Sequence, residues 1–258
     1  MSGRSVDALR AEWIKLSSVR STKVSYLLVV LLAVGLAAVV AAAADAPNNA
    51  QALSGLAGVT SGVPGPGLVL LLVTATVAVT GEWRVGTLRT TFLATPDRLW
   101  AVTAKGLVVG AFSAVVGFLA AGLGVLVAGA LARPSATELG FSGDLRLLWT
   151  VPVAGFFGAF FAIGVGNVIR HSAGAITLLV VWLLVLETLA QTLVVGVSGH
   201  AAHIPQALLP FTSLGEFVSG HGSPTLTEYS PSAAFFVFAA WSLAVFAAGA
   251  VVTLRRDP

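Results

Sequence analysis

Glu187 is the only acidic residue deep inside one of the long apolar stretches of this chain. Gln191 lies one helical turn further on, and Thr188 and Thr192 form a neighbouring strip at the same spacing. A charge at the centre of a bilayer costs on the order of 3 kcal/mol or more unless it is paired or neutralised. Two interpretations stay open. These four side chains contact a solute on a path through the membrane, or a protonated Glu187 is hydrogen-bonded to another helix and serves packing.

The chain carries no pattern for binding a nucleotide. A phosphate-binding loop needs Gly-Lys-Ser/Thr, whereas the residues that follow the three lysines are Leu, Val and Gly. The absence of cysteine also excludes a thiolate nucleophile, a disulfide framework and a Cys-ligated zinc site.

Two weaker patterns do not favour chemistry either. Residues 196–199 read Gly-Val-Ser-Gly, as in intramembrane serine proteases, but the last apolar stretch holds no histidine to activate the serine. A further set could ligate zinc, but its segment is rich in Gly and Pro, which favours solvated side chains: His200, His203, Glu216 and His221. We expect no catalytic residue, no metal and no cofactor in this chain.

Composition indicates a membrane protein. Of the 258 residues 57% are hydrophobic and 10% are charged, and the mean hydropathy is +0.94. A soluble domain carries roughly 25% charged residues, so a soluble enzyme, a disordered protein and a nucleic-acid binder are excluded. Arg outnumbers Lys by 11 to 3 amid abundant Ala, Gly and Val, which is typical of a bacterium with GC-rich DNA.

We predict an all-α membrane protein, a single transmembrane domain over residues 1–258. A helix needs about 20 apolar residues to cross the bilayer core, and six stretches satisfy this: 24–44, 63–80, 96–132, 147–169, 173–197 and 232–254. Thr95 is predicted to cap the third span, with Pro96 at its first position. In that span Gly110, Gly117 and Gly124 repeat every seven residues, which predicts a packing seam within the chain or across a dimer. Asn167 is predicted to bridge or cap helices.

Basic residues predict the orientation. Twelve of the 14 Lys and Arg residues fall on one side of the predicted spans, and only Arg133 and Arg146 fall on the other. Because basic residues gather in cytoplasmic segments, both termini are predicted to be cytoplasmic.

Two segments beside the spans are amphipathic. Val6, Leu9, Trp13 and Leu16 recur at helical spacing, which predicts a helix over 4–20 at the inner membrane surface, in contact with membrane lipids. The loop at 81–95 has room for one short helix, which could present Leu88 and Phe92 to a groove on a partner while Arg84 and Arg89 reach acidic groups. The alternative is a basic loop that serves topology alone.

These two segments also carry a resemblance. The run Arg-Ala-Glu-Trp-Ile-Lys-Leu at 10–16, the pattern Glu82-x-x-x-Gly86-Thr87-x-Arg89-x-Thr91 before Pro96, and the six spans resemble the permease subunits of type II ABC exporters. The resemblance implies that the N-terminal helix is an interfacial connecting helix. It further implies that the loop forms a cytoplasmic coupling helix, which docks on a separate ATP-binding subunit through Glu82, Arg84, Gly86, Thr87 and Arg89.

In that family the segment between spans five and six is an outer re-entrant hairpin, here 199–231. Its apolar side chains would form an outer gate: Leu208, Phe211, Leu214 and Phe217. The resemblance implies a non-catalytic permease of a bacterial cell membrane, paired as a homodimer and with ATP-binding-cassette subunits that bind ATP and Mg²⁺. It would export an amphipathic substrate such as a drug, antibiotic, lipid or peptide. The alternatives are a proton-coupled secondary transporter that uses Glu187, and a non-transporting membrane scaffold.

Overall fold

The computed structural model describes residues 2–43, 66–94, 97–131, 145–198, 208–220 and 230–255, and within these ranges helices are the only regular elements. Six of its helical stretches are long and apolar enough to cross a membrane. They are α2 (Arg20–Ala43), α4 (Pro66–Val85), α6 (Arg98–Leu131), α8 (Leu147–Ile169), the run of α9 (Ser172–Val181), η1 (Trp182–Leu186) and α10 (Glu187–Ser198), and α13 (Pro231–Arg255). This confirms the predicted all-helical, multi-pass character.

Three shorter helices accompany the spans: α1 (Ser2–Ser18), α5 (Thr87–Ala94) and α12 (Pro210–Ser219). Helix α1 corresponds to the predicted helix at 4–20, and α5 lies in the predicted loop at 81–95. Of the hairpin predicted at 199–231, the structure describes α12 and the residues beside it. His200, His203 and His221 lie outside the described residues, as does Gly199.

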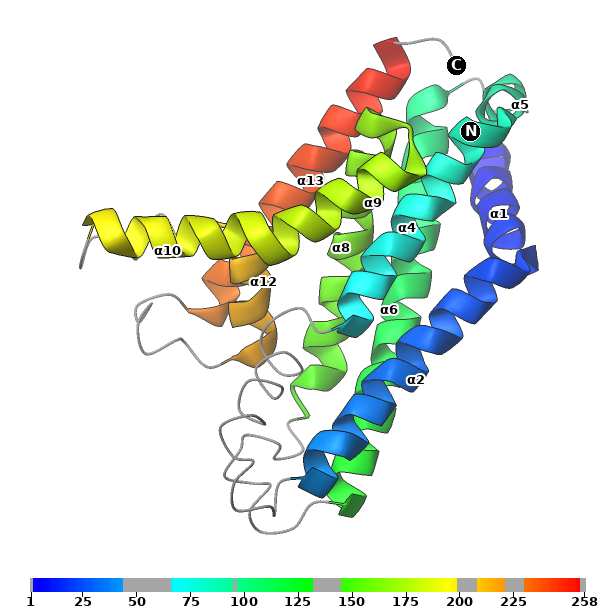
Figure 1. Ribbon diagram of the computed structural model, residues 1–258. Helices are drawn as coiled ribbons and strands as arrows, with labels where there is room; N and C mark the ends of the chain where they lie inside the picture. Colours follow the sequence, from blue (N-terminus) through cyan, green and yellow to red (C-terminus); the bar gives the residue numbers. More distant parts are fainter. Residues whose placement is uncertain are drawn as a thin grey trace.

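Both ends of the chain lie at the same end of the bundle, beside α5 (Figure 1). We call this the terminal end. Helix α8 is the central element and packs against α4, α6 and α13. Its side chains Phe161 and Ile163 are fully buried. The run from α9 to α10 follows α8 in the chain, the start of α10 lies beside α12, and the rest of α10 extends away from the other helices (Figure 1).

Small residues set how closely the spans approach. A Cβ atom added at Gly110 would lie 3.0 Å from the Phe156 ring, and one at Gly117 would lie 3.3 Å from the Val151 carbonyl oxygen. Both neighbours belong to α8, so this part of the predicted glycine seam packs within the chain. The closest approach joins α8 to α13, where a Cβ at Gly164 would lie 2.5 Å from the Val245 carbonyl oxygen. Close backbone contact of this kind is how helices associate in lipid.

The start of α6 differs from the prediction. Asp97 precedes the helix, and its Oδ1 accepts a hydrogen bond from the Trp100 backbone N–H at 3.0 Å. This is the geometry of an N-cap, whose side chain satisfies an N–H of the first turn that has no partner within the helix. Asp97 therefore occupies the N-cap position of the helix as described. Thr95 and Pro96 themselves lie outside the described residues.

Candidate functional site: a buried charge cluster at the terminal end

Four charged side chains from three helices meet at the terminal end. Lys105 Nζ of α6 donates to Glu12 Oε2 of α1 at 2.5 Å and to Glu82 Oε1 of α4 at 2.9 Å. Lys15 Nζ of α1 donates to Glu12 Oε1 at 2.6 Å and to the same Glu82 oxygen at 3.1 Å. We call Glu12, Lys15, Glu82 and Lys105 the four-charge cluster. Its two positive and two negative charges cancel.

Helical spacing and the ends of the spans place these groups. Glu12 and Lys15 are three residues apart, so they share one face of α1 with the buried Leu16. Glu82 lies in the last turn of α4, and Lys105 lies about two turns into α6. Glu82 follows the long apolar run of α4, and Lys105 precedes that of α6. An ionised group at either place needs a partner of opposite charge. The cluster supplies such a partner to each.

The contacts between Glu12 and Lys105 differ from surface ion pairs because both side chains are shielded from solvent. The side chains of Glu12 and Lys105 are each 6% exposed. Burial alone would raise the pKa of Glu12, but the ammonium groups of Lys105 and Lys15 outweigh it and hold that pKa below its usual value. Burial alone would lower the pKa of Lys15, and the carboxylates of Glu12 and Glu82 instead raise it. Both pKa shifts favour the ionised forms.

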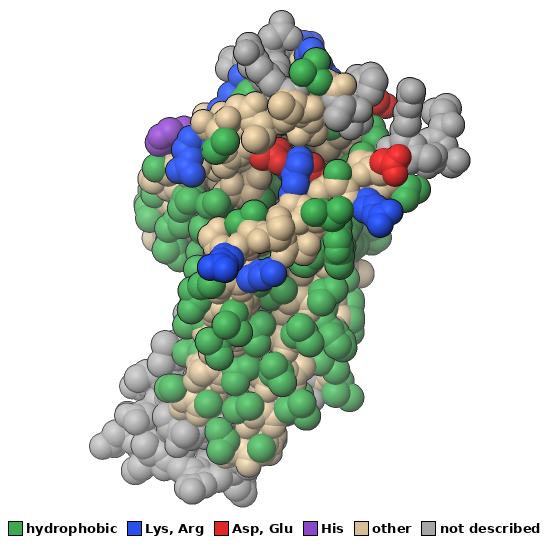
Figure 2. All heavy atoms as spheres, turned by 90° about the vertical axis from the view of Figure 1, so that its right-hand side faces the viewer, with side chains coloured by type: hydrophobic (Ala, Val, Ile, Leu, Met, Phe, Trp, Pro, Cys, Tyr) green, Lys and Arg blue, Asp and Glu red, His purple; other side chains and the backbone are tan. Residues whose placement is uncertain are grey.

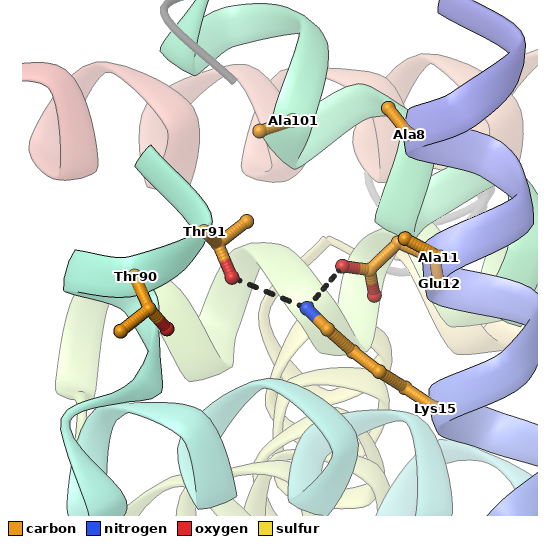
Figure 3. A pocket seen from close by; sticks show the side chains of 7 residues that line it. All are labelled: Ala8, Ala11, Glu12, Lys15, Thr90, Thr91 and Ala101. Carbon is orange, nitrogen blue, oxygen red and sulfur yellow. Dashed lines mark hydrogen bonds and ion pairs between the residues drawn. The ribbon is translucent and has the colours of Figure 1, made fainter. Parts of the chain in front are cut away.

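Helix α5 is tied to the cluster by one hydroxyl. Lys15 Nζ donates to Thr91 Oγ1 at 3.2 Å. Figure 3 shows Thr91 of α5 and Glu12 of α1 on either side of the Lys15 ammonium group. A small cavity of about 220 Å³ opens here between α1, α5 and α6, with mostly small side chains in its wall: Ala8, Ala11, Glu12, Lys15, Thr90, Thr91 and Ala101.

The exposed side of α5 is not the one that the sequence predicts. Leu88 and Phe92 are 3% and 8% exposed and belong to the chain's own core. Leu93 of α5 is 84% exposed, and Val85, the last residue of α4, is 69% exposed. These two exposed apolar side chains, at a polar end of the molecule, indicate a surface that could contact another protein, because they lack a partner within the described part of the chain.

The remaining residues assigned to coupling lie around the turn between α4 and α5. Gly86 has a φ of +75°, a conformation that side chains with a Cβ rarely adopt, so glycine permits the sharp turn. Arg84 and Thr87 are exposed, whereas Glu82 points into the four-charge cluster. Of Arg89 the structure describes only its place in α5. Whether these residues touch a partner stays a prediction.

A second polar contact joins three spans at the terminal end. Trp83 Nε1 of α4 donates to Asn167 Oδ1 of α8 at 3.2 Å, so Asn167 bridges helices as predicted. The Arg170 guanidinium lies 3.9 Å from the centre of the Trp83 ring, a cation–π contact. Arg170 also donates to the Val252 carbonyl of α13 at 3.2 Å. Together with the four-charge cluster, this contact connects five helices at the terminal end through polar side chains.

Charged groups gather at this end on the outside as well. Figure 2 shows Lys, Arg, Asp and Glu side chains on the upper part of one face, above a surface over α2 that is largely hydrophobic. Exposed apolar side chains on α2 include Leu27, Leu28 and Leu31. A band of charge above an apolar surface is the pattern of a protein at a membrane–water boundary.

The four side chains of the predicted solute path divide into two pairs. Glu187 is 3% exposed, and both it and Gln191 bond to α12. The Thr188 hydroxyl donates to the Leu184 carbonyl of η1, and the Thr192 hydroxyl donates to the Thr188 carbonyl of α10. Glu187 is thus hydrogen-bonded to another helix, which agrees with a packing role, while its protonation and a contact with a solute stay predictions.

Three of the four residues of the predicted outer gate have buried side chains. Phe211, Leu214 and Phe217 share the buried face of α12, and Leu208, just before this helix, is exposed. Aromatic contacts fix this face, with ring centres 5.2 Å apart for Phe211 and Phe161 and 5.1 Å apart for Phe217 and Phe235. In the conformation described they pack α12 against its own bundle.

Sequence reasoning did not identify the four-charge cluster as a unit. Glu12 and Lys15 enter the resemblance only as part of a run, and Lys105 counts only toward orientation. One signal was available: Glu82 and Lys105 carry opposite charges and border the apolar runs of two consecutive spans. Comparison of the sequence with protein-family models and with curated proteins finds no match. Within the described residues, no group of three or more potential ligands could hold a metal ion.

Proposed function

We propose that the chain is the membrane-spanning permease subunit of an ATP-driven exporter, of the type II ABC kind that its sequence resembles. It acts in a bacterial plasma membrane, with the terminal end in the cytoplasm, as a dimer with a second permease copy. Two separate subunits bind ATP and Mg²⁺ and supply the energy.

One observation supports this proposal above the others, the four-charge cluster. It joins α1, α4 and α6 directly, and the Thr91 hydroxyl adds α5. A displacement of a surface helix is transmitted to the membrane-spanning helices only if the two are rigidly connected. Helix α5 is connected to the cluster by the Lys15–Thr91 hydrogen bond and to the core by Leu88 and Phe92, so α5 cannot shift alone without breaking both connections. The cluster therefore passes a push on α5 to two spans.

The exposed side chains at and before α5 form the proposed contact surface for the ATP-binding subunit. Val85 and Leu93 are exposed on either side of the turn and helix α5, and Arg84, which precedes Val85, is exposed as well. Exposed apolar side chains and a cation in one segment suit a groove on a cytosolic subunit with an acidic rim. The apolar surface of the spans suits an amphipathic cargo.

Affinity purification of the full-length chain from its native membranes tests the proposal. We expect an ATP-binding-cassette subunit and its ATPase activity to co-purify. Leu93→Glu places a charge in the proposed contact and should reduce the co-purified ATPase activity at least about tenfold, since hot-spot contacts contribute on the order of 2 kcal/mol. Leu145→Glu is the matched control, because Leu145 is 70% exposed beyond the start of α8, away from α5.

Two outcomes would contradict the proposal. One is that Leu93→Glu and Leu145→Glu affect the co-purified activity equally. The other is that the purified chain, alone in lipid vesicles, transports solute on an ion gradient.

A further inference from the structure

Helix α12 has an unusual first turn, because its capping group comes from another helix. Its N-cap residue is Leu209, which has no side-chain acceptor, and Pro210 has no N–H. The Phe211 and Thr212 N–H groups instead donate to the two oxygens of Glu187, at 2.8 and 2.7 Å. Every N–H of this turn is thus satisfied, and Glu187 alone accepts the two that a helix cannot satisfy itself.

Further contacts tighten this end of the helix. The Thr212 hydroxyl donates to Glu187 Oε2 at 2.8 Å and accepts from Gln191 Nε2 at 2.7 Å. A carboxylate at a helix N-terminus also interacts favourably with the helix dipole. Helix α10 therefore holds the start of α12 by two side chains one turn apart.

A cation from a different span holds the other end. Arg146 precedes α8, and its Nη2 donates to the Phe217 carbonyl of the last turn of α12 at 3.5 Å. The helix ends at Gly220, with a φ of +66°, and a Cβ there would overlap the Arg146 guanidinium. A positive group at a helix C-terminus is favourable for the same reason as a negative group at the N-terminus. Helix α12 is thus held at its two ends by charges of the matching sign.

The segment just before Glu187 departs from α-helical geometry. Trp182–Leu186 form a π-helix, in which the Glu187 N–H donates to the Trp182 carbonyl. A π-helix holds one residue more than an α-helix of the same length, and each residue of an α-helix turns by about 100°. Conversion of this segment to an α-helix therefore rotates Glu187 relative to α9 by about that angle. Such a rotation moves its carboxylate away from α12.

We propose that Glu187 and Arg146 form a two-ended latch that seats α12 in the bundle, and that rotation of α10 at the π-helix releases it. The two ends of the latch lie on different spans, so α12 stays seated only while α10 and the start of α8 keep their relative position. Release exposes the face of Phe211, Leu214 and Phe217. Glu187 and Arg146 are positioning residues here, and the inference needs neither an ATP-binding partner nor a cargo.

A single-cysteine reporter tests the latch in the full-length chain in lipid nanodiscs. The chain has no native cysteine, so Ser213→Cys places one thiol on α12 at a site that is 1% exposed. The measurement is its rate of reaction with N-ethylmaleimide. Glu187→Gln and Arg146→Gln should each raise this rate at least about tenfold, because hydrogen bonds to charged groups are among the stronger ones. Thr192→Val is the matched control, since that hydroxyl donates to the Thr188 carbonyl within α10, and should leave the rate within about twofold.

A second reporter separates release of α12 from general unfolding. Ser113→Cys lies fully buried in α6, and its reaction rate should not change in either latch variant. The proposal is overturned if the rate at position 213 is unaffected by both latch variants. It is overturned equally if the rates at 213 and 113 rise together, because Glu187 and Arg146 would then support the whole fold.

Discussion

Replacement of Lys105 by methionine tests the four-charge cluster directly. Methionine keeps most of the volume of the side chain but removes its charge and its bonds to Glu12 and Glu82. The two carboxylates are then left with the single ammonium group of Lys15. Breaking a buried pair by removing one partner costs about 3–5 kcal/mol, because the remaining charge stays buried without compensation.

Thermal unfolding in lipid nanodiscs, followed by tryptophan fluorescence, measures this loss. For a chain of this size each kcal/mol corresponds to roughly 2–4 °C, so the midpoint should fall by roughly 10 °C. Lys23→Met is the matched control, since Lys23 is exposed on α2, and it should leave the midpoint nearly unchanged.

A double variant makes the test specific to the contact. Adding Glu12→Gln to Lys105→Met leaves Lys15 and Glu82 as one neutral pair, so the double variant should lose about 1–3 kcal/mol less than the sum of the single losses. The reasoning is refuted if the single and double losses add, or if Lys105→Met behaves like Lys23→Met.

Two further perturbations have expected outcomes. The pKa of Glu12 lies below its usual 4.5 and that of Lys15 above its usual 10.5. Stability from Glu12 is therefore complete above pH 4.5 and lost as the pH falls below it, and stability from Lys15 is complete below pH 10.5 and lost as the pH rises beyond it. Unfolding midpoints measured across pH should show this plateau, with a flatter acid limb in Glu12→Gln, and an unchanged limb would contradict it. Gly164→Ala should lower the midpoint, because its Cβ would collide with the Val245 carbonyl. Gly35→Ala, with open space around it, should raise it slightly through helix propensity, and equal effects would disprove the close contact.

The spans were predictable because each is a local property of the chain. Leu147–Ile169 begins and ends in the structure where its apolar run does, and the other spans differ by a few residues at their ends. The start of α6 was less predictable, since Thr95 and Asp97 are both good capping residues and two positions apart. Local sequence alone does not decide which of them lies where the first turn leaves an N–H without a partner.

The candidate site was predictable only in part. The short helix at 87–94 follows from the room between two spans and the glycine before it, but its orientation does not. Leu88 and Phe92 share one face, and that face packs against the chain's own core. An amphipathic helix shows which side is apolar, and the same pattern serves a core or a partner. Val85 and Leu93 became candidates only once the fold showed which side stays open.

By itself the sequence determined how much of the chain is apolar, where each helix can cross a bilayer, and that Glu187 needs a partner. These properties depend on residue type and on spacing within one helix. Only the tertiary structure decided which groups bond to Glu187 and to Lys105. Glu12 and Lys105 are 93 positions apart in the sequence, and Glu187 and Phe211 are 24 apart. Such pairings depend on how whole helices pack, and that packing is the sum of many weak contacts that no single stretch of sequence contains.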